Sequence, residues 1–136
     1  MEKYIYAVDF DGTIMEHVFP DIGDPVPHAF ETMKMLQEQG NLLILYTMRS
    51  GVYLDDAIKF CKERGIEFWA VNKNPEQYIW TSSPKVYAHF YIDDAMLGAP
   101  LIEVPGKRPY LNWLKIQEFL PGAQTNQHLV LPKDII

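Results

Sequence analysis

The chain has 136 residues, of which 48% are hydrophobic and 22% are charged, so it can bury the core of one compact domain. Its formal charge is −6 and its lysines and arginines are scattered, which argues against sequence-independent nucleic-acid binding, since that relies on a cationic surface. Because it has a single cysteine, Cys61, no apolar run as long as a membrane span and no signal peptide at its start, we expect a cytoplasmic protein without disulfides or a membrane partner.

The first part of the chain predicts two buried strands separated by a loop and a helix. Residues 4–8 are apolar and rich in β-branched and aromatic side chains, which is typical of a central strand. Prolines and glycines crowd residues 14–27, which indicates an irregular loop or a small flap. Apolar residues recur with helical spacing over 27–39, and 42–46 is a continuous apolar run that predicts a second buried strand.

The rest of the chain continues this alternation. Its expected elements are a helix over 54–64, a strand over 66–71, a loop with a helical turn over 74–84, strands over 86–92 and 101–104, and a helix over 109–120. Alternating strands and helices predict a Rossmann-like three-layer α/β sandwich, with a mostly parallel sheet and helices on both faces. We expect one domain with its core at about 3–120. A tail over 121–136 would dock its apolar end, 129–131, on the sheet edge or on a neighbouring chain.

Two carboxylates, Asp9 and Asp11, directly follow the first strand, and Gly12 after them permits a sharp turn. Ligand sites of α/β sheets lie beyond the carboxyl ends of the strands, so both acids are expected at the mouth of such a site. Carboxylates this close repel each other when ionised, and a bound cation removes the repulsion. A second pair, Asp93 and Asp94, ends the strand over 86–92. The structural alternative is that these acids only form turns or cap helices.

The chain resembles the haloacid dehalogenase superfamily in four motifs and in their order. Most members of that superfamily are phosphatases. The residues that carry the resemblance are Asp9-Phe10-Asp11-Gly12-Thr13, Thr47 after an apolar strand, Lys85, and Asp93-Asp94 after another apolar strand. The resemblance spans roughly residues 4–104, and the intervals between the motifs leave no room for a cap domain. In this superfamily a capless site takes a large substrate or is closed by a neighbouring subunit. In the second case the protein would be a homo-oligomer.

The resemblance implies a Mg²⁺-dependent phosphatase that hydrolyses a phosphomonoester through an aspartyl-phosphate. Asp9 would be the nucleophile and Asp11 the general acid and base. Thr47 and Lys85 would hold the transferring phosphoryl group. The implied metal ligands are Asp9, the backbone carbonyl of Asp11, Asp93 and Asp94. The candidate substrate-binding residues are Phe10, Gly12, Thr13, Met48 and Arg49, and His17 is the one histidine expected near the substrate.

Two other functions stay open at this stage. The first is a non-catalytic binding protein that keeps the fold and the metal site, although intact motifs argue against it. The second is a phosphatase that acts on nucleotide or polynucleotide ends, which the acidic balance of the chain disfavours. A small phosphorylated molecule is therefore the expected partner, and the sequence does not name it.

Overall fold

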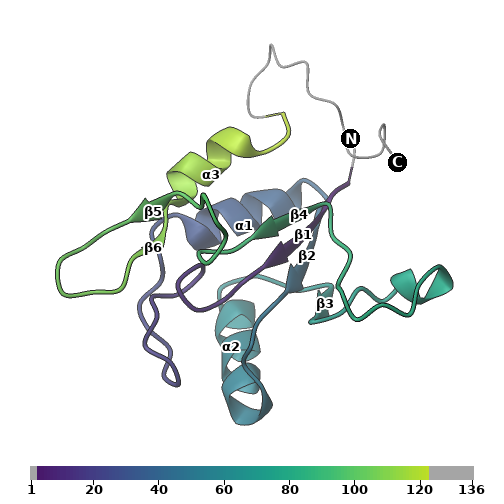
Figure 1. Ribbon diagram of the computed structural model, residues 1–136, viewed down its shortest axis with the longest axis horizontal. Coiled ribbons are helices and arrows are strands. Elements are labelled where there is room, and N and C mark those ends of the chain that lie inside the picture. The colour runs from purple at the N-terminus through teal and green to yellow at the C-terminus, as the bar shows by residue number, and fades with distance from the viewer. Residues whose placement is uncertain (1–2, 123–136) are drawn as a thin grey trace.

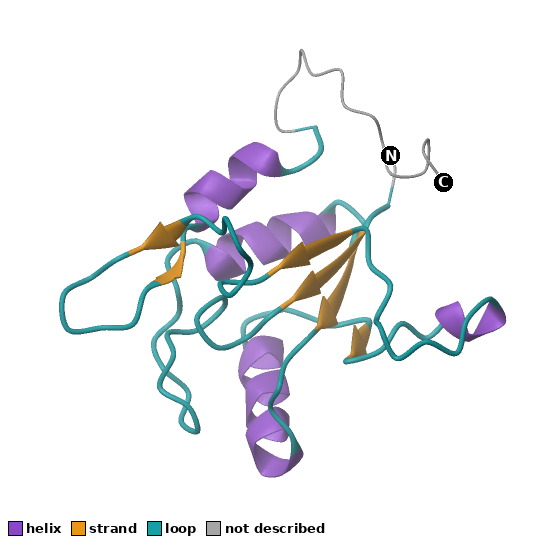
Figure 2. Cartoon of the chain, in the orientation of Figure 1, coloured by secondary structure: helices purple, strands orange, loops and turns teal. Residues whose placement is uncertain are grey.

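The computed structural model describes residues 3–122, which form an α/β domain around a four-stranded parallel sheet (Figure 1 and Figure 2). The sheet has the order β3-β2-β1-β4 and consists of β1 (Ile5–Val8), β2 (Leu42–Leu45), β3 (Ala70–Val71) and β4 (Phe90–Ile92). A separate antiparallel pair is formed by β5 (Leu101–Ile102) and β6 (Tyr110–Leu111). The helices are α1 (Ala29–Glu38), α2 (Gly51–Glu63), the 3₁₀ helix η1 (Gln77–Ile79) and α3 (Trp113–Phe119).

The register of the sheet brings three strand ends to the same level. Val8 of β1 lies opposite Leu45 of β2 and opposite Ile92 of β4, and both pairings are parallel. The chain therefore leaves these strands at one edge of the sheet. Asp9 and Asp93 are the next residues after β1 and β4, so the strand pairing itself places their carboxylates side by side.

The two faces of the sheet carry different cores. Side chains alternate between the faces of a strand, and on one face Tyr6 and Val8 belong to a large cluster with the buried residues of three helices, which include Met33 of α1, Cys61 of α2 and Trp113 of α3. The other face carries a small cluster of Ile44, Ala70 and Val86. Val86 comes from the segment 72–89, which also contains η1. The predicted α/β sandwich with a parallel sheet is confirmed, and its two outer layers are unequal.

Several element boundaries differ from the sequence expectation. The strands over 66–71 and 86–92 are reduced to β3 and β4, and α2 begins three residues earlier than expected. The helix predicted over 109–120 is wrong in its first part, because Tyr110 and Leu111 pair with β5. Asn112 then caps α3, since its side chain accepts a hydrogen bond from the backbone N–H of Lys115 at 3.1 Å.

Between β1 and α1 the chain forms a loop with two isolated bridges, Asp11 to Met15 and Met15 to Pro25, so residues 3–122 contain no inserted cap domain. No helix in this range is both long and apolar enough to cross a membrane. The predicted docking of 129–131 concerns residues outside the described range.

Candidate functional site

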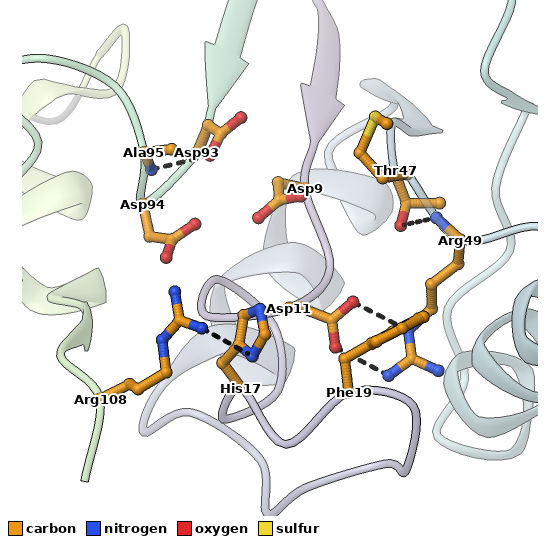
Figure 3. Close-up of a pocket in the computed structure, with 11 residues that line it drawn as sticks. Asp9, Asp11, His17, Phe19, Thr47, Arg49, Asp93, Asp94, Ala95 and Arg108 are labelled. Carbon is orange, nitrogen blue, oxygen red and sulfur yellow. Dashed lines mark hydrogen bonds and ion pairs between the residues drawn. The ribbon is translucent and has the colours of Figure 1, made fainter.

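A cavity of about 400 Å³ opens at the carboxyl edge of the sheet (Figure 3). It is lined by Asp9, Asp11, His17, Phe19, Thr47, Met48, Arg49, Asp93, Asp94, Ala95 and Arg108. These residues follow β1, β2 and β4, except that His17 and Phe19 come from the loop over 14–27 and Arg108 comes from the loop between β5 and β6. The structure thus brings together most of the predicted catalytic and metal-binding residues.

Three carboxylates form the acidic side of the cavity. Asp9, Asp93 and Asp94 each offer one oxygen, and these oxygens all lie within 4.8 Å of one another. The buried hydroxyl of Thr13 donates to Oδ2 of Asp9 at 2.9 Å and accepts from the backbone N–H of Asp94 at 3.0 Å. Thr13 therefore ties the end of β1 to the end of β4 and sets the spacing of the acids.

The crowding of these acids changes their ionisation. Burial, together with the charge of Asp93 and a hydrogen bond to Asp94, raises the pKa of Asp9 to about 8, against a smaller lowering by Thr13. Burial also raises the pKa of Asp93. A cation held by three oxygen ligands would reverse this effect, because it favours the charged carboxylates. The donor set fits a divalent cation that prefers hard oxygen ligands.

Gly12 allows the acids to approach this closely. Its φ of 84° lies in the left-handed region, and a Cβ atom at this position would collide with the carboxylate of Asp94. Phe10 and Thr13 are fully buried. The prediction that Phe10, Gly12 and Thr13 bind substrate is corrected here, because these residues build the site from behind and do not line the cavity.

The side chain of Arg49 belongs to the framework of the site. Its Nε and Nη2 donate to the two carboxylate oxygens of Asp11 at 2.8 and 2.7 Å. Nη1 donates to the carbonyls of Pro20 and Tyr53, and Nη2 also donates to the carbonyl of Asp21. An arginine has five N–H donors, so all of them are used. The structure therefore gives Arg49 a positioning role in place of the predicted substrate binding, because its side chain holds Asp11.

Thr47 and Met48, which follow β2, line the cavity as predicted. The Thr47 hydroxyl accepts a hydrogen bond from the backbone N–H of Arg49 at 3.1 Å. Within residues 3–122 this hydroxyl donates to no protein acceptor, so its hydrogen can be donated toward the cavity. The Thr47 backbone N–H donates to the side chain of Asn72 at 2.8 Å, which fixes the loop after β2 against the loop after β3. Met48 is 98% exposed and forms part of the rim.

Lys85 does not reach the cavity, and the prediction that it does is wrong. It lies in the segment 72–89, next to Val86, which packs on the face of the sheet against Ile44 and Ala70. The backbone carbonyl of Lys85 accepts a hydrogen bond from the side chain of Gln77 at 3.0 Å. The cavity lies at the carboxyl edge of the sheet, where β1 and β4 end.

The sequence reasoning missed two residues with reactive or aromatic side chains, Phe19 and Arg108. Phe19 lies in the loop over 14–27, which the sequence predicts as an irregular loop or a small flap without a role for this side chain. Arg108 follows Pro105-Gly106, a turn signal between two short apolar runs. That signal predicts the β5–β6 hairpin, but it gives no indication that the hairpin loop reaches the carboxyl edge of another sheet.

No family model matches the chain, and no curated protein matches it either. A solved structure does match, and it is described as the structure of the conserved protein coded by locus from Bacteroides thetaiotaomicron. The sequences are 42% identical, the match covers 87% of this chain and 89% of that chain, and the TM-score is 0.71. The chain belongs to the family of that conserved protein. The two chains share the α/β fold.

Proposed function

We propose that the protein is a Mg²⁺-dependent phosphomonoester hydrolase of the haloacid dehalogenase type. The observation that carries the proposal is the convergence of Asp9, Asp11, Thr47 and the pair Asp93-Asp94 on one cavity. The cation would be held by Asp9, Asp93 and Asp94, with the backbone carbonyl of Asp11. When bound, it would neutralise charge on the phosphate and on the carboxylates.

Asp9 is the nucleophile in this proposal. A carboxylate oxygen attacks the phosphorus, the bond between phosphorus and the alcohol oxygen breaks, and an aspartyl-phosphate forms. Asp11 gives a proton to the leaving alkoxide. It then accepts a proton from the water that attacks the aspartyl-phosphate, which releases inorganic phosphate and restores Asp9. Since Thr13 occupies Oδ2 of Asp9, the other oxygen, Oδ1, is the one we assign to the attack.

Arg49 and Thr47 support these steps in different ways. Arg49 holds both oxygens of Asp11, so the acid–base group keeps its position while it exchanges protons. Thr47 has a free hydroxyl hydrogen at the cavity wall, which can donate to an oxygen of the transferring phosphoryl group. Donors that are fixed before the reaction stabilise the charge that develops in the transition state.

The decisive experiment measures hydrolysis of p-nitrophenyl phosphate by purified protein with Mg²⁺, with EDTA, and with Mg²⁺ restored in excess after EDTA. We expect turnover only in the presence of the metal. Beryllium fluoride with Mg²⁺ should bind the wild-type protein as an aspartyl-phosphate analogue and should fail to bind the Asp9→Asn variant. Full turnover in metal-free buffer would contradict the metal role.

Extending this assay to ester binding and to phosphorylated oligonucleotides separates the two alternatives. A non-catalytic binding protein would bind phosphate esters in the presence of Mg²⁺ and release no phosphate from any of them. An end-processing phosphatase would release phosphate from oligonucleotide ends much faster than from small esters. We expect turnover of small esters, because the cavity of about 400 Å³ is lined by four carboxylates that repel a polyanion.

A further inference from the structure

The cavity contains one guanidinium group for which the proposed reaction has no role. Arg108 enters the cavity from the side opposite Thr47 (Figure 3). Its Nη1 donates to Nδ1 of His17 at 3.4 Å, and no carboxylate in residues 3–122 forms an ion pair with it. Most of its five N–H donors are therefore available to a ligand, in contrast to those of Arg49.

The position of Arg108 is set by contacts that tie the β5–β6 hairpin to the first motif. The backbone N–H of Leu111 donates to the carbonyl of Gly12 at 3.0 Å, and Nε1 of Trp113 donates to the carbonyl of Thr13 at 2.7 Å. On the other side of Arg108, Lys107 forms an ion pair of 3.1 Å with Glu16. The loop is thus anchored on both sides of Arg108, which lowers the entropic cost of holding a ligand there.

The place of Arg108 indicates which part of a substrate it meets. In an in-line displacement the leaving oxygen lies opposite the attacking oxygen, and the group that protonates it, Asp11, marks that side of the cavity. Figure 3 shows His17 and Arg108 on the same side of Asp9 as Asp11, away from the strands of the sheet. A group bound there belongs to the alcohol part of the substrate and not to the transferring phosphoryl group.

We propose that Arg108, together with His17, binds a second anionic group on the alcohol part of the substrate, which is a carboxylate or a second phosphate. This inference rests on the proposed function, because that reaction defines the alcohol part. A guanidinium group recognises either anion through paired N–H donors. Four carboxylates line the cavity and would repel the anion. Arg108 offsets that repulsion and makes the anion a condition for tight binding.

The test compares kcat/KM for matched esters. One pair is the phosphate ester of 3-hydroxypropanoate and that of its amide, and the other is propane-1,3-diol bisphosphate and the corresponding monophosphate. Loss of a charge-assisted hydrogen bond should lower the ratio of the anionic to the neutral ester by about 10- to 100-fold in Arg108→Ala. Arg108→Lys should keep part of the ratio as a point charge. The pair with the larger fall identifies the carboxylate or the phosphate as the preferred anion.

Arg64→Ala is the matched control, because Arg64 is an exposed arginine at the end of α2 that does not line the cavity. It should leave the ratio at its wild-type value. Thermal melting of Arg108→Ala would show that the hairpin variant folds. The inference would be overturned if the ratio stayed unchanged in Arg108→Ala, whether kcat/KM fell equally for both members of each pair or did not fall at all.

Calorimetric binding of the same esters to Asp9→Asn separates this inference from the proposed function. If the wild-type protein hydrolyses none of the esters, while the anionic members bind more tightly and lose this advantage in Asp9→Asn/Arg108→Ala, the proposed function fails and the anion site stands. Equal binding of the anionic and neutral members would overturn the anion site, whatever the turnover.

Discussion

We call the part of the cavity around Asp9, Asp11 and Arg49 its inner part, and the part around His17, Phe19 and Arg108 its outer part. The two parts differ in how many hydrogen bonds their arginine forms with other groups of the protein. In the inner part, Arg49 uses all five donors within the protein, and its side chain is only 1% exposed. In the outer part, Arg108 contacts His17 and Phe19 is 51% exposed. A saturated, buried arginine sets the geometry of the catalytic groups, whereas an unsaturated, exposed one is available to a ligand. Folding therefore supplies every partner of Arg49 but leaves most donors of Arg108 to a ligand.

The largest effect is expected from Asp9→Asn in the inner part. An amide cannot act as the nucleophile, so turnover of p-nitrophenyl phosphate should fall by at least about 10⁴-fold. The protein should stay folded, because asparagine has the shape of aspartate and adds no charge to the crowded site. Steady-state kinetics with a circular dichroism control will measure both effects. Residual activity near the wild-type level would rule out the aspartyl-phosphate.

The second effect concerns the framework of the inner part. Arg49→Ala leaves Asp11 without its partner and exposes the unpaired carbonyls of Pro20 and Asp21. Breaking a buried ion pair on one side costs about 3–5 kcal/mol of unfolding free energy. Urea denaturation will measure it. Arg64→Ala, which removes an exposed arginine, should cost much less. If the two variants lost equal amounts of unfolding free energy, Arg49 would contribute no more to stability than an arginine on the surface.

The third effect is the pH dependence of the metal-free protein. The pKa of Asp9 rises from its ordinary value of 3.8 to about 8 in the folded state. Between these values the unfolded chain has lost the proton and the folded protein keeps it, so this group lowers stability as pH rises. We expect the melting temperature to fall across this range and to recover with Mg²⁺. In Asp9→Asn this contribution should disappear, and a slope as steep as in the wild type would assign it to another group.

The smallest effect is expected from Lys85→Ala, outside both parts of the cavity. Lys85 is exposed and does not line the cavity. Turnover of p-nitrophenyl phosphate should stay within about twofold of the wild-type value, since surface substitutions remote from a site change stability and function little. A fall in turnover of a hundredfold or more would show that Lys85 contacts the phosphoryl group. That contact would require the segment 72–89 to move.

The strands and their carboxylates could be predicted because the evidence is local. Residues 4–8 form a strand through their apolar and β-branched composition, and Asp9 must follow it whatever the rest of the chain does. The Rossmann-like arrangement follows from the alternation of such segments. Lys85 shows where this reasoning ends, because spacing along the chain does not tell whether a loop residue reaches the cavity. The strand predicted over 86–92 is four residues too long at its start, since only Phe90–Ile92 pairs.

Local sequence patterns predict which residues carry reactive groups and which strands place them, since strand propensity and the turn at Gly12 act over a few neighbouring residues. Which charges meet depends on how the whole chain packs. Arg49 and Asp11 are 38 residues apart in the chain, and Arg108 and His17 are 91 apart. Their contacts depend on the order of the strands and on the docking of the β5–β6 hairpin, because a charge selects a partner only after packing of the core has brought the two segments together.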